Sequence, residues 1–278
     1  MRANHGEQDV KLSIGKAWEE ASTFLGREAR LVAPVALATF ALPTILAKWA
    51  FPGGATGGGA GWLMLIVLLT VLVGQMTVIL LVNGWHGSIG EALAKAARRL
   101  PVLVAALIIL FLPIVLIATI ALGSALVGAG ITDAAGVTPA ALAKVPGVAW
   151  IIVLLAVAFI FLWVRMFPAS AIAASETVGP IALIKRSWTL TKGVFFRLLV
   201  LALLLGLVGL ILDWSVTAVV GSIATLAAGE PKAFNTPALI VALAGGLVGA
   251  VVSTVSAAMA GRVYAQLATT PNVTVPKT

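Results

Sequence analysis

Side chains that could catalyse a reaction or ligate a metal are scarce in this chain. It contains two histidines, His5 and His86, and no cysteine. Metal sites need several convergent ligands, and a serine nucleophile needs a positioned base. No cluster of histidine and acidic residues has metal-ligand spacing, and the G-x-S-x-G, P-loop and dinucleotide-binding motifs are missing from the sequence. We therefore expect a protein that is not an enzyme and that uses no metal or cofactor.

Basic residues give the clearest chemical signal. The chain has 18 Lys and Arg against 10 Asp and Glu, and its formal net charge is +8. These cations flank apolar runs, so anionic lipid headgroups are a better predicted partner than nucleic acid. The residues that we expect at the headgroup level are Lys16, Lys95, Arg98, Arg99, Lys185, Arg186, Trp188 and Lys192.

Three further residues are candidates for polar pairs: Arg165, Glu176 and Asp213. Glu176 has Arg165 and Lys185 as candidate partners. Asp213 is the deepest acid in any apolar run and is followed by Trp214. It is interpreted either as an interfacial carboxylate beside an aromatic belt or as a member of an ion pair or substrate contact.

The elements that carry these residues must span a membrane. Of the 278 residues 61% are hydrophobic and only 10% are charged, and the mean hydropathy is +1.12. This composition excludes a cytosolic enzyme, a nucleic-acid-binding domain and a disordered chain. It predicts an all-α polytopic membrane protein forming a single membrane domain over 1–278. The six expected spans are Leu31–Phe51, Trp62–Val82, Val102–Leu126, Val148–Phe167, Leu198–Val220 and Ala238–Met259.

The distribution of cations predicts the orientation of the spans. Only Lys48, Lys144 and Lys232 fall on one side, and all the other Lys and Arg residues fall on the opposite side. Positively charged loops stay in the cytoplasm. Both termini are therefore predicted to be cytoplasmic.

An amphipathic segment precedes each odd-numbered span. Apolar residues in these segments recur at helical spacing opposite a basic face. The registers align at Ile14-Gly15-Lys16-Ala17-Trp18 and Ile184-Lys185-Arg186-Ser187-Trp188. This pattern predicts three cytoplasmic-side interfacial helices and a pseudo-threefold repeat with units at 12–86, 87–178 and 179–267, followed by a polar tail at 268–278.

Small residues recur every four positions along the sixth span. They are Gly245, Gly249, Ser253, Ala257 and Gly261. Small residues at this spacing allow two helix backbones to approach closely. The stripe is interpreted as a packing face, used either within the chain or against an oligomer or partner.

The segment 165–205 carries a more specific pattern. It includes Gly179-Pro180-Ile181-Ala182-Leu183, then Ser187-Trp188, and then Phe195-Phe196-Arg197 entering an apolar span. It resembles the membrane domain of the glycerophosphoryl diester phosphodiesterase membrane-domain family. In the enzyme that gave the family its name, catalysis belongs to a separate soluble barrel. The resemblance therefore implies a bacterial inner-membrane protein without phosphodiesterase activity.

Three functional hypotheses follow from these patterns. The first is a non-catalytic, lipid-associated scaffold that docks partner membrane proteins or a second copy of itself. The second is an accessory subunit of a larger membrane complex, including an energy-transducing one. The third is a transporter of lipid or a small solute.

Overall fold

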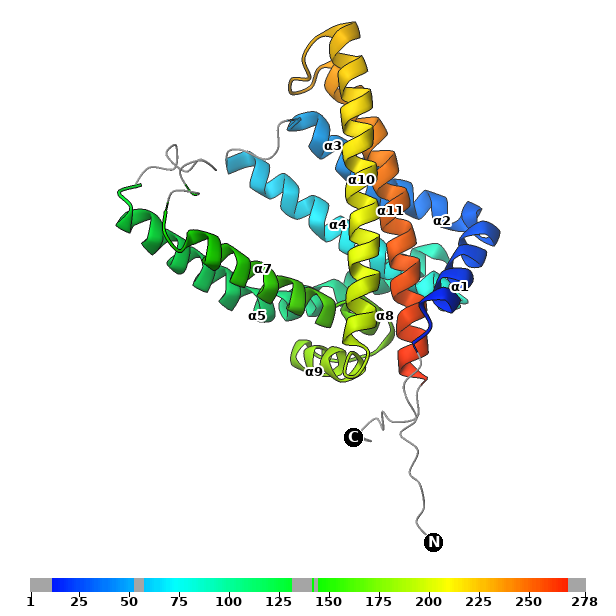
Figure 1. The fold of residues 1–278 in the computed structure, drawn as a ribbon. Coiled ribbons are helices and arrows are strands. Elements are labelled where there is room, and N and C mark those ends of the chain that lie inside the picture. The colour runs from blue at the N-terminus through cyan, green and yellow to red at the C-terminus, as the bar shows by residue number, and fades with distance from the viewer. Residues whose placement is uncertain (1–11, 53–57, 132–141, 143–144, 270–278) are drawn as a thin grey trace.

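Every regular element that the structure describes is a helix. The structure, a computed structural model, describes residues 12–52, 58–131, 142 and 145–269. The helices are α1 (Ile14–Arg27), α2 (Ala29–Ala36), the π-helical turn η1 (Leu37–Ala41), α3 (Leu42–Ala50), α4 (Gly58–Val82), α5 (Ile89–Gly128), α7 (Val148–Arg165), α8 (Ala169–Ser175), α9 (Pro180–Leu190), α10 (Phe195–Ala228) and α11 (Thr236–Ala268) (Figure 1).

Six helical stretches are long and apolar enough to cross a membrane, which confirms the predicted number of spans. They are Ala29–Ala50, Ala60–Val82, Ile89–Gly128, Val148–Ser175, Phe195–Ala228 and Thr236–Ala268. The third, fifth and sixth extend past the predicted limits at both ends, whereas the fourth joins α7 to the separate helix α8 through a turn at 166–168. Hydropathy marks the apolar run alone, whereas a helix continues through polar flanks for as long as its backbone hydrogen bonds are made.

The first span is interrupted by a π-helical turn. Its middle section, η1, lies directly before Pro43, which is near the start of α3. Proline has no N–H to donate, so the regular hydrogen-bond ladder cannot pass through it unchanged. The Thr39 hydroxyl in η1 donates to the Val35 carbonyl oxygen at 2.7 Å. A wider turn therefore accommodates Pro43 within the span.

Only two of the three amphipathic segments form separate helices. α1 and α9 do so, but the segment beginning at Ile89 is continuous with the third span as the single 40-residue helix α5. The prediction of a separate second helix is therefore wrong. Helical φ and ψ angles persist through Pro101 at the expected junction, because proline removes one hydrogen bond but already has a helical φ angle. The pseudo-threefold repeat stays a prediction.

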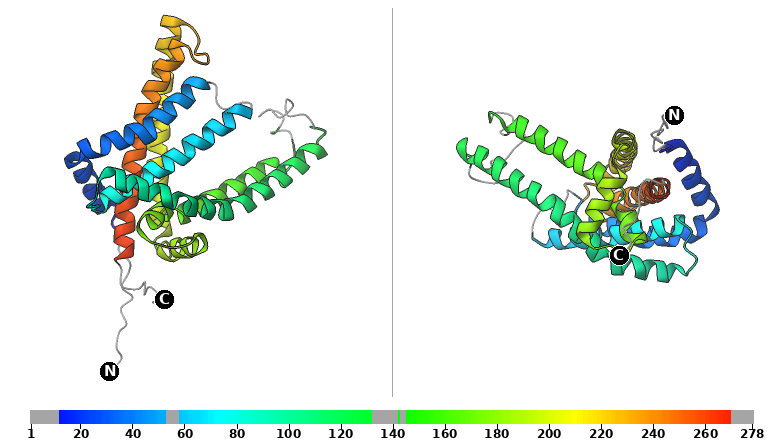
Figure 2. Two further views of the ribbon diagram at one scale, coloured as in Figure 1. Left: turned by 180° about the vertical axis from the view of Figure 1, so that it is seen from behind. Right: turned by 90° about the horizontal axis from the view of Figure 1, so that it is seen from below.

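Most of the core lies at one end of the helix bundle, where α8 and the end of α4 pack between α11 and the start of α5, α9 lies against α5 and α8, and α1 lies against α11 (Figure 1). We call this the basic end. In α5 the buried residues end at Ala106, and in α10 none lies between Ala202 and Ala224. Away from the basic end, the α5–α7 hairpin diverges from the α10–α11 hairpin (Figure 2). The fold is thus packed tightly at one end and open at the other.

Candidate functional site

A basic pocket lies where the loop after α4 meets the first turns of α5. Its volume is about 490 Å³. It is lined by Trp85, Glu91, Ala94, Lys95, Arg98 and Arg99. Three of the cations predicted to contact headgroups therefore share one site, which we call the Trp85 pocket.

Local backbone geometry positions the aromatic wall of the Trp85 pocket. Ser88 caps α5 by a capping box, in which Ser88 Oγ accepts from the Glu91 N–H and the Glu91 carboxylate accepts from the Ser88 N–H. Trp85 Nε1 donates to the Ser88 carbonyl oxygen at 3.2 Å. A Cβ at Gly87 would come within 2.8 Å of Trp85 Nε1. Glycine at this position therefore leaves room for the Trp85 indole to pack against the backbone of Gly87 and Ser88.

The charge of the Trp85 pocket suits an oxyanion. Lys95 Nζ lies 5.0 Å from the centroid of the Trp85 ring, a cation–π arrangement. Arg98 is exposed, whereas Lys95 and Arg99 are half-buried. Guanidinium groups bind phosphate through paired, charge-assisted hydrogen bonds. The three cations outnumber the single carboxylate of Glu91, so the lining of the pocket carries a net positive charge.

The basic residues of α9 divide into two groups. Lys185 of α9 and Lys192, in the turn after α9, are exposed. Arg186 is turned inward, with its side chain only 17% exposed and its Nε donating to Glu176 Oε1 at 3.1 Å. The same oxygen accepts from the Tyr264 hydroxyl at 2.9 Å. Glu176 therefore pairs with Arg186 and Tyr264, and the expected partners Arg165 and Lys185 are wrong.

Arg165 lies among aromatic rings. Its guanidinium carbon is 5.2 to 5.5 Å from the ring centroids of Phe161, Trp188 and Phe195. Its Nη1 donates to Thr191 Oγ1 at 3.0 Å. Trp188, predicted to contact headgroups, is half-buried in this cluster instead. The cluster joins α7, α9 and α10, so Arg165 connects two spans and the helix between them.

Asp213 forms an ion pair with Lys48. The Nζ of Lys48 lies 2.6 Å from Asp213 Oδ1, which joins the end of α3 to the middle of α10. Lys48 also lies against α11, because a Cβ at Gly245 would be 3.0 Å from its Nζ. A lysine and an aspartate that each carry charge into an apolar region are stabilised by pairing. The pair ties the first, fifth and sixth spans together away from the basic end.

The small residues of α11 do not share one face. Gly245, Ala257 and Gly261 are buried, whereas Gly249 and Ser253 are half-buried. A step of four residues turns the helix by about 40° beyond a full circle, so sixteen residues change direction by about 160°. Gly245 accordingly faces Lys48 and Asp213, and Gly261 faces Ile79.

A different set of small residues makes the close contact with the first span. The buried positions of α11 include Ala238, Ala242, Gly246, Ala250 and Thr254. A Cβ at Gly246 would collide with the Ile45 side chain of α3. The same close approach occurs at Gly74 of α4, where a Cβ would collide with Thr39 in η1. Gly246 and Gly74 therefore make close contacts with the first span that the expected stripe does not include, while Gly245, Ala257 and Gly261 of that stripe are also buried within the chain.

Sequence reasoning missed Tyr264 and the role of Trp85. Tyr264 is the only tyrosine in the chain and lies near the end of the sixth span, which is a signal for an interfacial hydrogen-bonding side chain. Trp85 follows the second span and belongs to no regular apolar pattern. Its signal is instead the pair of nearby glycines, Gly84 and Gly87. Trp85 contacts residues close to it in the sequence, whereas Tyr264 contacts Glu176, which only the folded chain brings near.

Among the residues that the structure describes, no three His, Cys, Asp or Glu side chains are grouped to hold a metal ion. Comparison with known proteins adds no assignment. No family model, no curated protein and no solved structure matches the chain.

Proposed function

We propose that this chain is a non-catalytic, lipid-associated membrane protein whose basic end holds anionic headgroups. The observation that carries the proposal is the Trp85 pocket, where Lys95, Arg98 and Arg99 surround one aromatic wall. The exposed Lys185 of α9 and Lys192, in the turn after it, lie at the same basic end. Each basic residue near an anionic membrane surface contributes about 1 kcal/mol of attraction.

The location and orientation are part of this proposal. The excess of Lys and Arg on one side favours cytoplasmic termini, which would place the basic end at the inner leaflet. The resemblance of 165–205 to the phosphodiesterase membrane-domain family supports a bacterial inner membrane. The Ser187-Trp188 pair of this segment belongs to the cluster around Arg165. Ser187 Oγ donates a hydrogen bond to the Arg165 carbonyl oxygen at 2.6 Å. The interfacial helices and the repeat belong to the same proposal.

A scaffold that docks other membrane proteins needs a free face. Gly245, Ala257 and Gly261 are buried within the chain, so these positions of α11 are not available to a partner. The parts of α5, α7 and α10 that lie away from the basic end carry exposed apolar side chains. An accessory subunit would use those faces, and it would co-purify with its partner in fixed ratio. A transporter of lipid or solute would instead produce flux in liposomes.

The test is retention of anionic lipid by the purified protein, measured by native mass spectrometry. We expect the triple substitution Lys95→Gln, Arg98→Gln and Arg99→Gln to lower retention of phosphatidylglycerol by roughly a hundredfold, the effect of losing about 3 kcal/mol. Lys232→Gln, at the opposite end, is the control and should leave retention unchanged. Equal retention by the triple variant and the native protein would refute the proposal.

A further inference from the structure

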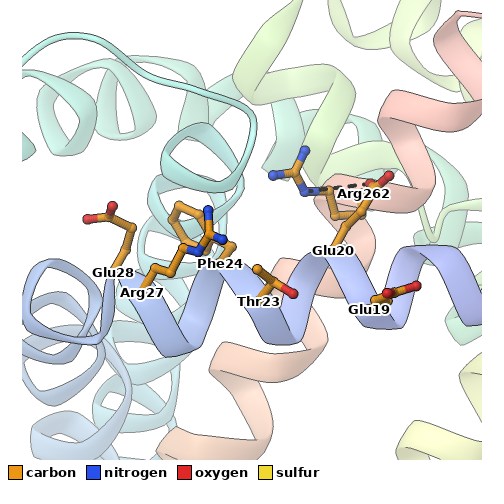
Figure 3. Close-up of a pocket in the computed structure, with 7 residues that line it drawn as sticks. All are labelled: Glu19, Glu20, Thr23, Phe24, Arg27, Glu28 and Arg262. Atoms are coloured by element: carbon orange, nitrogen blue, oxygen red, sulfur yellow. Dashed lines mark ion pairs between the residues drawn. The ribbon is translucent and has the colours of Figure 1, made fainter.

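A second pocket lies at the basic end between α1 and α11 (Figure 3). Its volume is about 470 Å³. Its lining consists of Glu19, Glu20, Thr23, Phe24, Arg27, Glu28 and Arg262. Six of these residues belong to α1 and its C-cap, and Arg262 reaches over from α11. We call it the Arg262 pocket.

The spacing of α1 explains why these side chains converge. Residues 19, 20, 23, 24, 27 and 28 recur at intervals of four, which keeps them along one side of a helix. Ala17 and Ala21 are fully buried, and their small side chains let α1 lie close to α11. The half-buried ring of Phe24 forms the apolar part of the lining between the charged groups.

The charged groups of the Arg262 pocket do not satisfy one another. Glu20 Oε2 lies 4.0 Å from Arg262 Nε, and Glu20 Oε1 lies 3.9 Å from Lys16 Nζ. Both separations exceed hydrogen-bond length. The Arg262 Nε atom is enclosed and has no hydrogen-bond partner among the described residues. A buried donor without an acceptor is costly, so a ligand oxygen that reaches this guanidinium would be stabilising.

We propose that the Arg262 pocket binds a zwitterionic phosphate–ammonium headgroup of the phosphoethanolamine type. Arg262 and Arg27 would donate hydrogen bonds to the phosphate, and the neighbouring carboxylates of Glu19 and Glu20 would accept hydrogen bonds from the ammonium group. A purely anionic headgroup fits less well, because the lining has three carboxylates and two arginines. This site differs from the Trp85 pocket in charge and in ligand.

The first test compares phosphatidylethanolamine with phosphatidylcholine of the same acyl chains, offered in equal amounts to the purified full-length protein. The trimethylated ammonium of choline has no N–H to donate to the carboxylates. Native mass spectrometry should show phosphatidylethanolamine retained about fivefold more often, the effect of losing one charge-assisted hydrogen bond. Equal retention of the two lipids would overturn the proposal.

Variants then assign the preference to this pocket. Arg262→Gln removes the guanidinium, and Glu19→Gln and Arg27→Gln alter two exposed side chains that can change without disturbing the packing. Each variant should lose the preference for phosphatidylethanolamine. Retention of phosphatidylglycerol, read in the same spectra, should not change, because it reports the Trp85 pocket. A preference that survives all three substitutions would overturn the assignment, whatever the fate of the proposed anionic-lipid site.

Soluble glycerophosphoethanolamine distinguishes a free headgroup from an intact lipid. Displacement of bound phosphatidylethanolamine by this probe would support the headgroup chemistry and show that the headgroup alone is the ligand. A preference that the probe does not displace would support the same chemistry within a lipid whose chains add to the binding.

Discussion

Two long helices of this molecule, α5 and α11, are both apolar enough to span a membrane, but they pack very differently. In α11, fifteen of 33 residues are buried, and they are distributed from Pro237 to Leu267. In α5, only four of 40 residues are buried, and the last of them is Ala106. The buried residues of α11 are largely Ala and Gly, whereas the later part of α5 is rich in Leu, Ile and Val. In an apolar solvent, close backbone approach made possible by small side chains holds helices together, and hydrophobicity alone does not.

The largest expected effect tests this contrast within α5 itself. Leu103 is 2% exposed and Leu116 is 53% exposed. Leu103→Ala should lower the free energy of unfolding by about 2–4 kcal/mol, because it leaves a cavity in the basic end. Leu116→Ala, the matched control, should change it by less than about 0.5 kcal/mol. Thermal unfolding in detergent measures both. Equal losses would contradict the division of α5 into a packed and an open half.

An intermediate effect is expected from the glycines of α11. Gly246 lies against Ile45, whereas a Cβ at Gly249 would meet nothing within 4 Å. Gly246→Ala should destabilise the protein by about 1–3 kcal/mol through overpacking. Gly249→Ala should be neutral or slightly stabilising, because alanine favours a helix over glycine. Thermal unfolding in detergent measures both variants. A larger loss of stability for Gly249→Ala than for Gly246→Ala would show that α11 approaches the first span on the Gly249 face.

The smallest effect concerns the ion pair between α3 and α10. A double-mutant cycle with Lys48→Met and Asp213→Leu should give a coupling energy of about 1 kcal/mol, because each single change leaves one charge unpaired. The double variant should therefore be more stable than the sum of the single changes implies. Additive effects would mean that the pair does not hold the α10–α11 hairpin to the first span.

The number of spans and much of the basic end could be predicted from the sequence, because hydropathy and charge are local properties. The continuity of α5 could not, because Pro101 and the change from polar to apolar residues both favour a break. The partner of Glu176 could not be predicted either. Lys185 and Arg186 are adjacent, and only the direction of α9 against Tyr264 selects Arg186.

The candidate sites show the same limit. Lys95, Arg98 and Arg99 are identifiable as one basic run, since they lie on successive turns. The Arg262 pocket joins residues from opposite ends of the chain, so no local pattern reveals it. The close contact at Gly246 could not be predicted either, since both Gly245 and Gly246 are small and only the packed helices show that Gly246 lies against Ile45.

The helix α5 is anchored near one end and extends well beyond it, so a small rotation at the anchor moves its other end by several ångströms. Its forty residues form a rod about 60 Å long, of which roughly 33 Å extends beyond the buried anchor at Ala106. A tilt of about 10° at the anchor would move the far end by roughly 6 Å, because the displacement grows with the length of the arm. Whatever occupies the Trp85 pocket contacts the short arm of this rod. If the proposed function holds, a headgroup bound at one membrane surface is connected through one continuous helix to the position of α5 at the other surface.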